Sequence, residues 1–289
     1  MKFSVVIPCF NAADTLKDQL KALFLQCQSR DWEIIIADNG STDGTLEIAK
    51  MYGSLYPNLR IVDASDRRGP SHARNIGARV ATGDALLFCD ADDQIASGWV
   101  AAMEKALQKY DFVASRFDSS LLSSPRSLAA KGNKRQQKGL IIYNYVSFLP
   151  YAGSSGLGVK RSIHNAVGGF NEDMTACEDC DYCWKIQLSG TTLHFVPEAL
   201  VFTRHKEPGS GLWRQARNWG MNNALLNKKY RPLGMPRAPM KTGLKLWYQL
   251  FRGFPKMIRF QDSRDRWIWN ASYRFGQLIG CIKFRVLAL

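Results

Sequence analysis

The 289-residue sequence has no long uninterrupted apolar run. No window reaches the roughly 18 consecutive apolar residues that a bilayer-spanning helix requires, so we expect a chain that does not cross a membrane. The first apolar run is also too short for a secretory signal, because Pro8, Asn11 and Asp14 interrupt it. We therefore predict that this run is the first strand of a folded cytoplasmic domain.

Negative charge is scarce in the last part of the sequence. The net charge is +14, and residues 206–289 hold 17 Lys and Arg against 3 Asp and Glu, whereas residues 1–205 hold 22 of each kind. The basic stretch is also rich in tryptophan and phenylalanine. This mixture is typical of proteins that contact an anionic membrane surface or nucleic acid, but it also occurs on ordinary solvated faces of packing helices.

Apolar runs and helical periodicities alternate through the first hundred residues. We expect strands at residues 3–8, 33–38 and 59–63, each followed by a segment in which apolar residues recur with helical spacing. Such regular alternation predicts an α/β fold with a doubly wound, mostly parallel central sheet flanked by helices. The residues beyond position 205 are expected to form a helical C-terminal appendage.

A fourth apolar run, Ala85 to Phe88, is followed at once by Asp90, Asp92 and Asp93. Ligands bind at the carboxyl ends of strands in open α/β sheets. Three such close carboxylates repel one another unless a cation or hydrogen-bond donors compensate them, and their oxygens suit magnesium or manganese. The stretch therefore predicts a divalent-cation site. The alternative is a loop in which Asp93 or Ser97 caps the next helix.

The pattern changes after residue 117. Residues 119–139 are rich in Ser, Lys, Arg, Gln and Gly, and we interpret them as a mobile loop over the site or a disordered segment. Two short strands are expected at residues 192–196 and 200–205, with helices from there to the end.

Four ordered blocks of the sequence resemble family-two glycosyltransferases with the GT-A fold: VVIPCFNAADTL, IIIADNGSTDGT, GPSHARNIGARVATGDALLFCDADD and GGFNEDMTACEDCDYCWKIQLSG. The resemblance implies a GT-A catalytic domain over residues 1–205. Its nucleotide-sugar part would span about 1–93, and its acceptor and base part about 140–205. Residues 206–289 would form a separate helical region.

The resemblance implies a site for a nucleotide-diphosphate sugar donor. The residues that would contact the nucleotide are Pro8, Phe10, Asn11, Asp38, Arg74, Asn75 and Asp90. Among them, Asp38 would accept a hydrogen bond from the base, Arg74 would stabilise phosphate charge, and Asp90 would face the ribose. A turn cap is the structural alternative for Asp38, and a surface helix position is the alternative for Arg74.

The same resemblance implies a divalent cation, Mn²⁺ or Mg²⁺, between the chain and the two phosphates. Asp92 would ligate this ion, which would neutralise charge on the departing diphosphate. His205 would approach the same ion, because imidazole is an acceptable ligand for manganese. A histidine with a purely structural role is the alternative.

A general base for an inverting transfer is implied as well. Glu178 and Asp179 match the family's acidic pair, in which the aspartate usually takes the proton of the acceptor hydroxyl, and Glu178 would help to bind the acceptor. Asp181 competes for the role of base because it lies only two residues further on. An acidic first turn that favours the helix dipole is the structural alternative for all three.

These implications predict a metal-dependent inverting glycosyltransferase that moves one sugar to a saccharide or lipid-linked acceptor in cell-surface polysaccharide or glycolipid synthesis. A nucleotidyltransferase shares the alternating layout, but PCFNAAD lacks the usual glycine-rich basic loop. A basic binding module on a degenerate fold is a third interpretation, against which the intact acidic blocks argue. The spacing of Cys177, Cys180 and Cys183 resembles a metal site, but no fourth cysteine lies near them in the sequence.

The last part of the chain, residues 241–289, shows two basic amphipathic patterns. Such helices can lie among the headgroups of an anionic membrane, which would make the protein peripheral on the cytoplasmic face and bring it near a lipid-linked acceptor. Folding back on the catalytic domain and dimerisation are the alternatives, and we expect no nucleic-acid partner. The sequence does not identify the sugar, the nucleoside, the acceptor or the oligomeric state.

Overall fold

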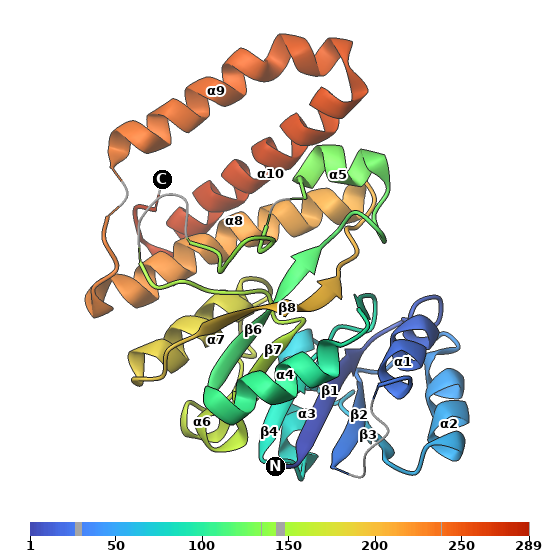
Figure 1. Cartoon of the computed structure of the whole chain (residues 1–289). Coiled ribbons are helices and arrows are strands. Elements are labelled where there is room, and N and C mark those ends of the chain that lie inside the picture. The colour runs from blue at the N-terminus through green and yellow to red at the C-terminus, as the bar shows by residue number, and fades with distance from the viewer. Residues whose placement is uncertain (27–30, 134, 143–147, 238, 289) are drawn as a thin grey trace.

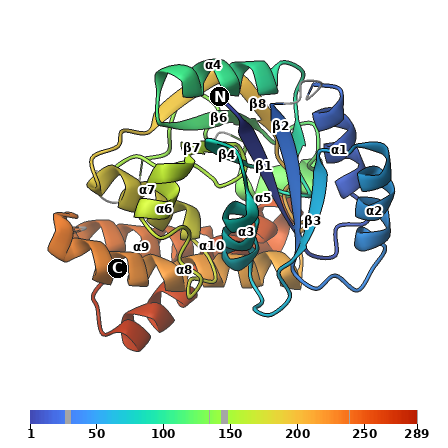
Figure 2. The same ribbon diagram turned by 90° about the horizontal axis from the view of Figure 1, so that it is seen from below.

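The computed structural model of the chain describes residues 1–26, 31–133, 135–142, 148–237 and 239–288. Figures 1 and 2 show a mixed α/β domain with helices against its central sheet and a layer of long helices beside it. The sheet has eight strands in the order β3-β2-β1-β4-β7-β6-β8-β5. The predicted α/β class is confirmed.

The first half of the sheet is parallel. It consists of β1 (Phe3–Cys9), β2 (Trp32–Asp38), β3 (Leu59–Asp63) and β4 (Ala85–Phe88), connected by α1 (Leu16–Phe24), α2 (Thr45–Leu55) and α3 (Pro70–Val80). Successive residues of β1 enter different cores: Val5 and Ile7 pack with α1, while Val6 packs on the side of α3. Burial on both faces explains why this strand reads as an apolar run without alternation.

The second half of the sheet is mixed. β4 pairs antiparallel with β7 (Leu157–Lys160), and the order continues through β6 (Phe112–Asp118), β8 (His194–Phe202) and the two-residue β5 (Gln94–Ile95). Helices α4 (Trp99–Lys109), α6 (Arg161–Ala166) and α7 (Glu178–Leu188) complete this half.

The two short strands predicted near residues 192–205 are one strand, β8. Its pairing with β6 shifts register, because Ser115 faces Val196 and the next residue, Arg116, faces Leu200. The unpaired stretch contains Pro197, which has no N–H to donate, and such irregularities are where a sheet tolerates proline. The sequence signal for a break was therefore real, but it marks a bulge within one strand.

The interpretation of residues 119–139 as a loop or disordered segment is wrong for its middle part, which forms α5 (Pro125–Lys131). Ser124 caps this helix by accepting a hydrogen bond from the Ser127 N–H, and Pro125 occupies the first turn. Arg126 pairs with Asp265 at 2.6 Å and fixes α5 on the C-terminal region. Composition did not reveal this helix, because its partner lies 139 residues away.

The C-terminal region consists of α8 (Ser210–Tyr230), a short 3₁₀ turn (Arg231–Leu233), α9 (Met240–Arg259) and α10 (Gln261–Phe284). Helix α10 packs against α8, α5 and α9, so α8 and α10 fold back on the catalytic part of the chain, while α9 lies outermost (Figure 1). Within the described residues, none of the helices combines the length and the apolar character that crossing a membrane requires.

Glycines set the distance between α8 and α10. A Cβ added to Gly276 would lie 1.9 Å from the Arg217 carbonyl oxygen, and one added to Gly220 would lie 1.9 Å from the Tyr273 carbonyl oxygen. The two backbones are therefore in direct contact, and no side chain fits between them at these positions.

We expect Gly276→Ala to lower the free energy of unfolding by about 1–3 kcal/mol in urea titrations, because the two helices must separate to admit a methyl group. Gly211→Ala is the matched control: the added Cβ has open space around it on α8, so this change should be neutral or stabilising. Equal stability of the two variants would contradict the tight contact.

Candidate active site

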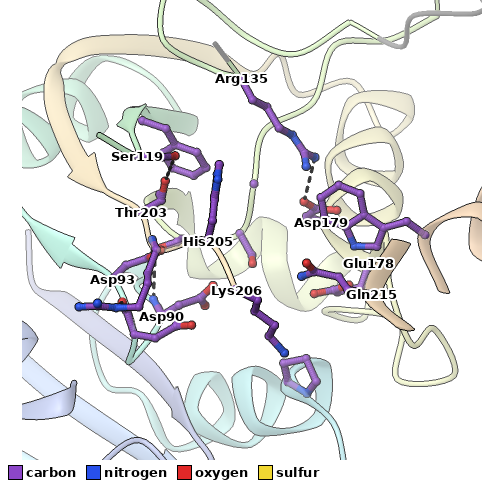
Figure 3. Close-up of a pocket in the computed structure, with 18 of the residues that line it drawn as sticks. Asp90, Asp93, Ser119, Arg135, Glu178, Asp179, Thr203, His205, Lys206 and Gln215 are labelled. Atoms are coloured by element: carbon purple, nitrogen blue, oxygen red, sulfur yellow. Dashed lines mark hydrogen bonds and ion pairs between the residues drawn. The ribbon is translucent and has the colours of Figure 1, made fainter. Parts of the chain in front are cut away.

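A cavity of about 1750 Å³ lies at the carboxyl ends of β1, β4 and β8, between the parallel half of the sheet, the start of α7 and the helices α8 and α10. Asp90 and Asp93 lie on one side of it and Glu178 and Asp179 on the other (Figure 3). The acidic stretch after β4 and the acidic pair of α7 therefore share one cavity, although 85 residues separate them in the sequence.

The first acidic group is the link between β4 and β5. One carboxylate oxygen from each of Asp90, Asp92 and Asp93 lies within 4.8 Å of the others. Burial and the neighbouring Asp90 raise the pKa of Asp92, and burial and the adjacent carboxylates hold the pKa of Asp93 well above its usual range. Burial is the main cause of these shifts, and repulsion between the carboxylates, which a cation would relieve, adds to it.

Asp93 has a supporting role in this group. Its side chain is almost fully buried, and its Oδ1 accepts a hydrogen bond from the Arg204 backbone N–H at 2.9 Å. It does not cap the following helix, because the residue at the start of α4 is Gly98 and no side chain caps it.

Arg74 of α3 joins the two acidic groups. Its Nη2 lies 2.6 Å from Asp90 Oδ1 and its Nη1 lies 3.2 Å from Glu178 Oε1. The side chain is only 3% exposed, so the alternative of a surface arginine does not apply, whereas Arg79 on the same helix is exposed. The planar guanidinium thus sets the separation between the carboxylates after β4 and those of α7.

Glu178 and Asp179 begin α7, after Cys177 in the left-handed conformation. Asp179 Oδ1 accepts the Cys180 N–H at 2.8 Å, and its Oδ2 lies 3.9 Å from the Arg135 guanidinium. Burial raises the pKa of both carboxyl groups, while Arg135 partly opposes the shift at Asp179. Both side chains line the cavity.

Asp181 lies away from the cavity. It is fully buried, and its Oδ1 contacts Lys229 Nζ at 2.5 Å and the Tyr230 hydroxyl at 2.9 Å. These contacts fix α7 on α8. Asp181, the alternative candidate for the base in the sequence, is therefore separated from Glu178 and Asp179, which line the cavity.

His205, just beyond β8, lines the same cavity. Burial and the nearby Lys131 lower its pKa to about 4, so the ring is neutral near pH 7. Its Nδ1 is buried, and no hydrogen-bond partner for it is found among the described residues. His205 is not part of the group formed by the three aspartates in the described chain, but the neutral imidazole is the form of histidine that binds metals.

The residues expected beside the nucleoside divide into two sets. Pro8, Phe10 and Asn11 line the cavity, whereas Asp38 and Asn75 do not. Asp38 Oδ2 accepts the backbone N–H groups of the two residues that follow Asn39, both at 3.1 Å, and its buried Oδ1 has no partner in the part of the chain that is described. Asp38 thus supports the turn after β2 and keeps one acceptor unused.

Asn75 acts on a neighbouring turn. Its Oδ1 accepts the Phe170 N–H at 2.8 Å, and its Nδ2 donates to the Phe170 carbonyl and to Glu172. Because these bonds occupy its amide group, the structure assigns Asn75 to the GGFNE turn and not to the cavity surface, which corrects the expectation from the sequence.

Several cavity residues had no predicted role. Arg68, from the loop before α3, lies 4.6 Å from the centroid of the Phe10 ring. Lys131 Nζ lies 5.1 Å from the centroid of Trp219 and 5.3 Å from that of Trp269. Burial lowers the pKa of Lys131 to about 8. The basic and aromatic composition after residue 205 indicated a binding surface, but it did not show that Trp219 and Trp269 face the cavity.

The cysteine run of α7 belongs to the core. Cys180 and Cys183 are buried free thiols, and burial holds the pKa of Cys180 well above its usual range. Cys183 Sγ contacts the Ala152 carbonyl at 3.7 Å. Within the described residues no cysteine belongs to a cluster that could hold a metal, so the spacing reflects packing of one helix face.

Two family models match the chain. The model described as glycosyl transferase family 2 matches residues 4–163, and the model described as glycosyl transferase family group 2 matches residues 139–288. The first match covers more than half of the sequence, and it includes the β1 loop, Arg74 and the aspartates after β4.

Curated relatives match in part. The chain is 44% identical over 94 residues to the "Uncharacterized glycosyltransferase YibD" of Escherichia coli, covering 32% of this chain and 27% of the relative. It is 27% identical over 247 residues to the "Pre-mycofactocin glycosyltransferase" of Mycobacterium tuberculosis, covering 83% of this chain and 48% of the relative. The chain thus spans less than half the length of these curated relatives.

Solved structures share the fold. The mannosyltransferase PcManGT from Pyrobaculum calidifontis, in complex with GDP-Man and Mn²⁺, is 19% identical with a TM-score of 0.69, and the match covers 98% of this chain and 87% of that one. TarS of S. aureus in complex with UDP-GlcNAc is 21% identical with a TM-score of 0.55, covering 78% and 67%. At these identities the likeness establishes a GT-A type fold alone.

Proposed function

Because the chain belongs to glycosyl transferase family 2, and is thus a glycosyltransferase, we propose that its cavity moves one sugar, with inversion, from a nucleotide-diphosphate sugar to a saccharide or lipid-linked acceptor. One observation carries this proposal. Two acidic groups, the carboxylates after β4 and those at the start of α7, line the same cavity, and the guanidinium of Arg74 bridges them through Asp90 and Glu178. Donor activation needs one such group and acceptor deprotonation needs the other.

The donor is proposed to lie along the carboxyl edge of the parallel strands. Phe10 and Asn11 would contact the nucleoside from the loop after β1. Asp38 at the end of β2 would accept a hydrogen bond from the base through its unused Oδ1. Asp90 would face the ribose, while Arg74 keeps its carboxylate oriented. Arg68, exposed beside Phe10, adds a positive charge where the diphosphate would enter.

The three carboxylates after β4 fit a divalent cation, since one oxygen from each lies within 4.8 Å of the others, and burial together with the neighbouring carboxylates raises the pKa of Asp92 and Asp93. When bound, Mn²⁺ or Mg²⁺ supplies Lewis-acid stabilisation of the leaving diphosphate. Asp92 would bind the ion directly, His205 would approach it as a neutral imidazole, and Asp93 holds the loop in place through Arg204. Two solved structures of similar fold contain Mn²⁺.

Asp179 is the proposed general base. Its Oδ1 is occupied by the Cys180 N–H, which leaves Oδ2 directed toward the cavity near Arg135. Burial raises its pKa, and a carboxylate with a raised pKa is a stronger proton acceptor in its ionised form. Glu178 is engaged by Arg74, so it is proposed to position the acceptor side and not to take the proton.

The acceptor would enter between α7 and the wall made by α8 and α10. Trp219 and Trp269 provide aromatic surface for a sugar ring, and Lys131 and Arg135 provide positive charge beside it. An acceptor that carries a phosphate or another anionic group fits this composition. A role in cell-surface polysaccharide or glycolipid synthesis follows as part of the proposal, and family membership favours it over the nucleotidyltransferase interpretation.

We expect the chain to be stabilised by a sugar nucleotide only when Mn²⁺ is present. A thermal-shift screen of UDP- and GDP-linked sugars, with Mn²⁺ or with EDTA, measures this directly. At a donor concentration of 100 times the dissociation constant, the stabilisation should be about 2.7 kcal/mol. Asp92→Asn should abolish the metal-dependent part while keeping the unliganded melting temperature.

Asp111→Asn is the matched control, because Asp111 is an exposed aspartate at the start of β6, outside the cavity. This variant should keep the full metal-dependent shift. A metal-dependent donor shift in Asp92→Asn that equals the shift of the unmodified chain would refute the proposed metal site. An equal donor-induced shift with Mn²⁺ and with EDTA would refute the metal dependence of donor binding.

A further inference from the structure

Helix α9 lies on the outer side of α10, away from the sheet (Figure 1). It is held there by one side: Trp267 of α10 donates its indole N–H to the Leu250 carbonyl at 2.7 Å, and the rings of Phe254 and Trp267 lie 5.7 Å apart. Gly243 is its one buried position among the residues that the structure describes. The exposed residues of the helix on its remaining sides are therefore available to a partner.

One face of α9 is apolar and largely uncovered, and Phe254 at its edge is the member that contacts α10. Six large side chains on it are between 47% and 70% exposed: Met240, Leu244, Tyr248, Phe251, Phe254 and Ile258. Their spacing of three or four residues places them on a single face of the helix. So much exposed aromatic and aliphatic surface on one helix marks an interaction site.

A basic stripe runs beside this apolar face. With 100° of rotation per residue, the cations of α9 fall along one flank that adjoins it: Lys241, Lys245, Arg252, Lys256 and Arg259. The helix contains no aspartate or glutamate. A strongly apolar face bordered by unopposed positive charge is the pattern of a helix that lies in the interface of an anionic bilayer.

A small apolar cavity opens at the start of the same face. It has a volume of about 330 Å³ and is lined by Met240, Leu244, Trp247 and Leu287, together with Gly243 and two arginines, Arg231 and Arg237. An apolar slot whose lining includes two arginines matches an acyl chain that ends in a phosphate headgroup. This cavity and the exposed face therefore point to the same ligand chemistry.

We propose that α9 is an interfacial helix that docks the protein on an anionic lipid surface. The apolar face lies among the acyl chains, and the basic stripe contacts the lipid phosphates. Pairing with a second copy through this face is disfavoured, because a symmetric contact would bring the two basic stripes together without any acidic residue of α9 to compensate them.

Docking through α9 also orients the active site. The adjacent helix α10 carries Trp269 and Tyr273, which line the large cavity. The acceptor side of the cavity is thus attached to the membrane-facing layer, as a lipid-linked acceptor requires. Lipid binding itself does not depend on the proposed sugar transfer and is measured separately from it.

The test is sedimentation of the full chain with vesicles of phosphatidylcholine alone or with 30% phosphatidylglycerol. We expect at least tenfold tighter binding to the anionic vesicles, weakening as salt is raised. The double variant Leu244→Ser/Phe251→Ser should lose at least tenfold in affinity. Met51→Ser/Leu55→Ser is the matched control, because it removes two exposed apolar side chains of α2 on another part of the surface, and it should bind as the unmodified chain does.

The inference is overturned if the unmodified chain stays in the supernatant with anionic vesicles, or if the α9 variant pellets as fully as the control. It is also overturned if the α9 substitutions instead dissolve a dimer seen by sedimentation velocity, which would identify a second copy as the occupant. The Mn²⁺-dependent donor shift should be unchanged in the α9 variant. Absence of the donor shift from the unmodified chain, with vesicle binding intact, would count against the proposed function and not against docking.

Discussion

Asp179→Asn is expected to lower the rate of sugar transfer by about 10²–10⁴-fold, the usual contribution of a positioned general base, and to retain the Mn²⁺-dependent donor shift. The amide keeps the shape of the side chain and the hydrogen bond that Oδ1 accepts from the Cys180 N–H. It cannot take a proton from the acceptor hydroxyl. Initial rates at saturating donor, together with thermal shift, separate the two effects.

The pH dependence of transfer follows from the same carboxyl group. Burial raises the pKa of Asp179, and only the ionised form can act as a base. Transfer should therefore fall as the pH drops through this raised pKa, at a higher pH than an ordinary aspartate with a pKa near 3.9 would give. The acid limb of the pH profile should be absent from the residual activity of Asp179→Asn.

The control for this prediction is Asp173→Asn, because the Asp173 side chain is 86% exposed and forms a surface ion pair with the half-exposed Arg67. Such a pair contributes little, so its rate and pH profile should match those of the unmodified chain. Full activity in a folded Asp179→Asn protein would exclude Asp179 as the base. The same experiment with Glu178→Gln distinguishes the two members of the pair.

Arg74→Met is expected to lower the free energy of unfolding by about 3–5 kcal/mol, since removing one partner of a buried ion pair leaves its carboxylates uncompensated. Arg74 is 3% exposed, and its partners Asp90 and Glu178 are 29% and 14% exposed. We also expect transfer to fall, because both carboxylates lose the group that orients them. Urea unfolding followed by circular dichroism measures the stability.

Arg79→Met provides the matched control on the same helix, where the side chain is exposed. It should change the free energy of unfolding by less than about 0.5 kcal/mol. Adding Glu178→Gln to Arg74→Met should restore part of the lost stability, because it removes one of the unpaired charges. If Arg74→Met is as stable as Arg79→Met, the ion pairs of Arg74 with the two acidic groups do not contribute to the free energy of unfolding.

The parallel half of the fold was predictable because its signals are local. β1, β2 and β4 are short apolar runs that are buried along their length, whereas β3 at the sheet edge is mostly exposed. β1, β2 and β3 are each followed by a helix with its own periodicity. The acidic end of β4 was predictable for the same reason, since a buried strand followed by three carboxylates indicates a site whatever its neighbours are. The predicted fold class follows from these elements alone.

The other half depends on pairings that the sequence does not encode locally. The bulge at Pro197 reads as a break between strands, and α5 is fixed by an ion pair to Asp265. Two basic amphipathic segments look alike in the sequence, yet α10 is packed into the domain and α9 is exposed. Asn75 and Asp181 lie within site motifs, but their hydrogen bonds and ion pairs are used in packing.

The strand order has a consequence for how the protein is made. β4 and β5 are neighbours in sequence but are separated by three strands in the sheet. The link between them, which carries the carboxylates proposed to bind the metal, is held by Arg204 through Asp93 Oδ1 and the Asp92 carbonyl. During synthesis the aspartates leave the ribosome long before Arg204 does. A nascent chain therefore holds these aspartates without their final arrangement, and we expect the proposed donor site to form only after the half of the sheet that contains β8 has folded.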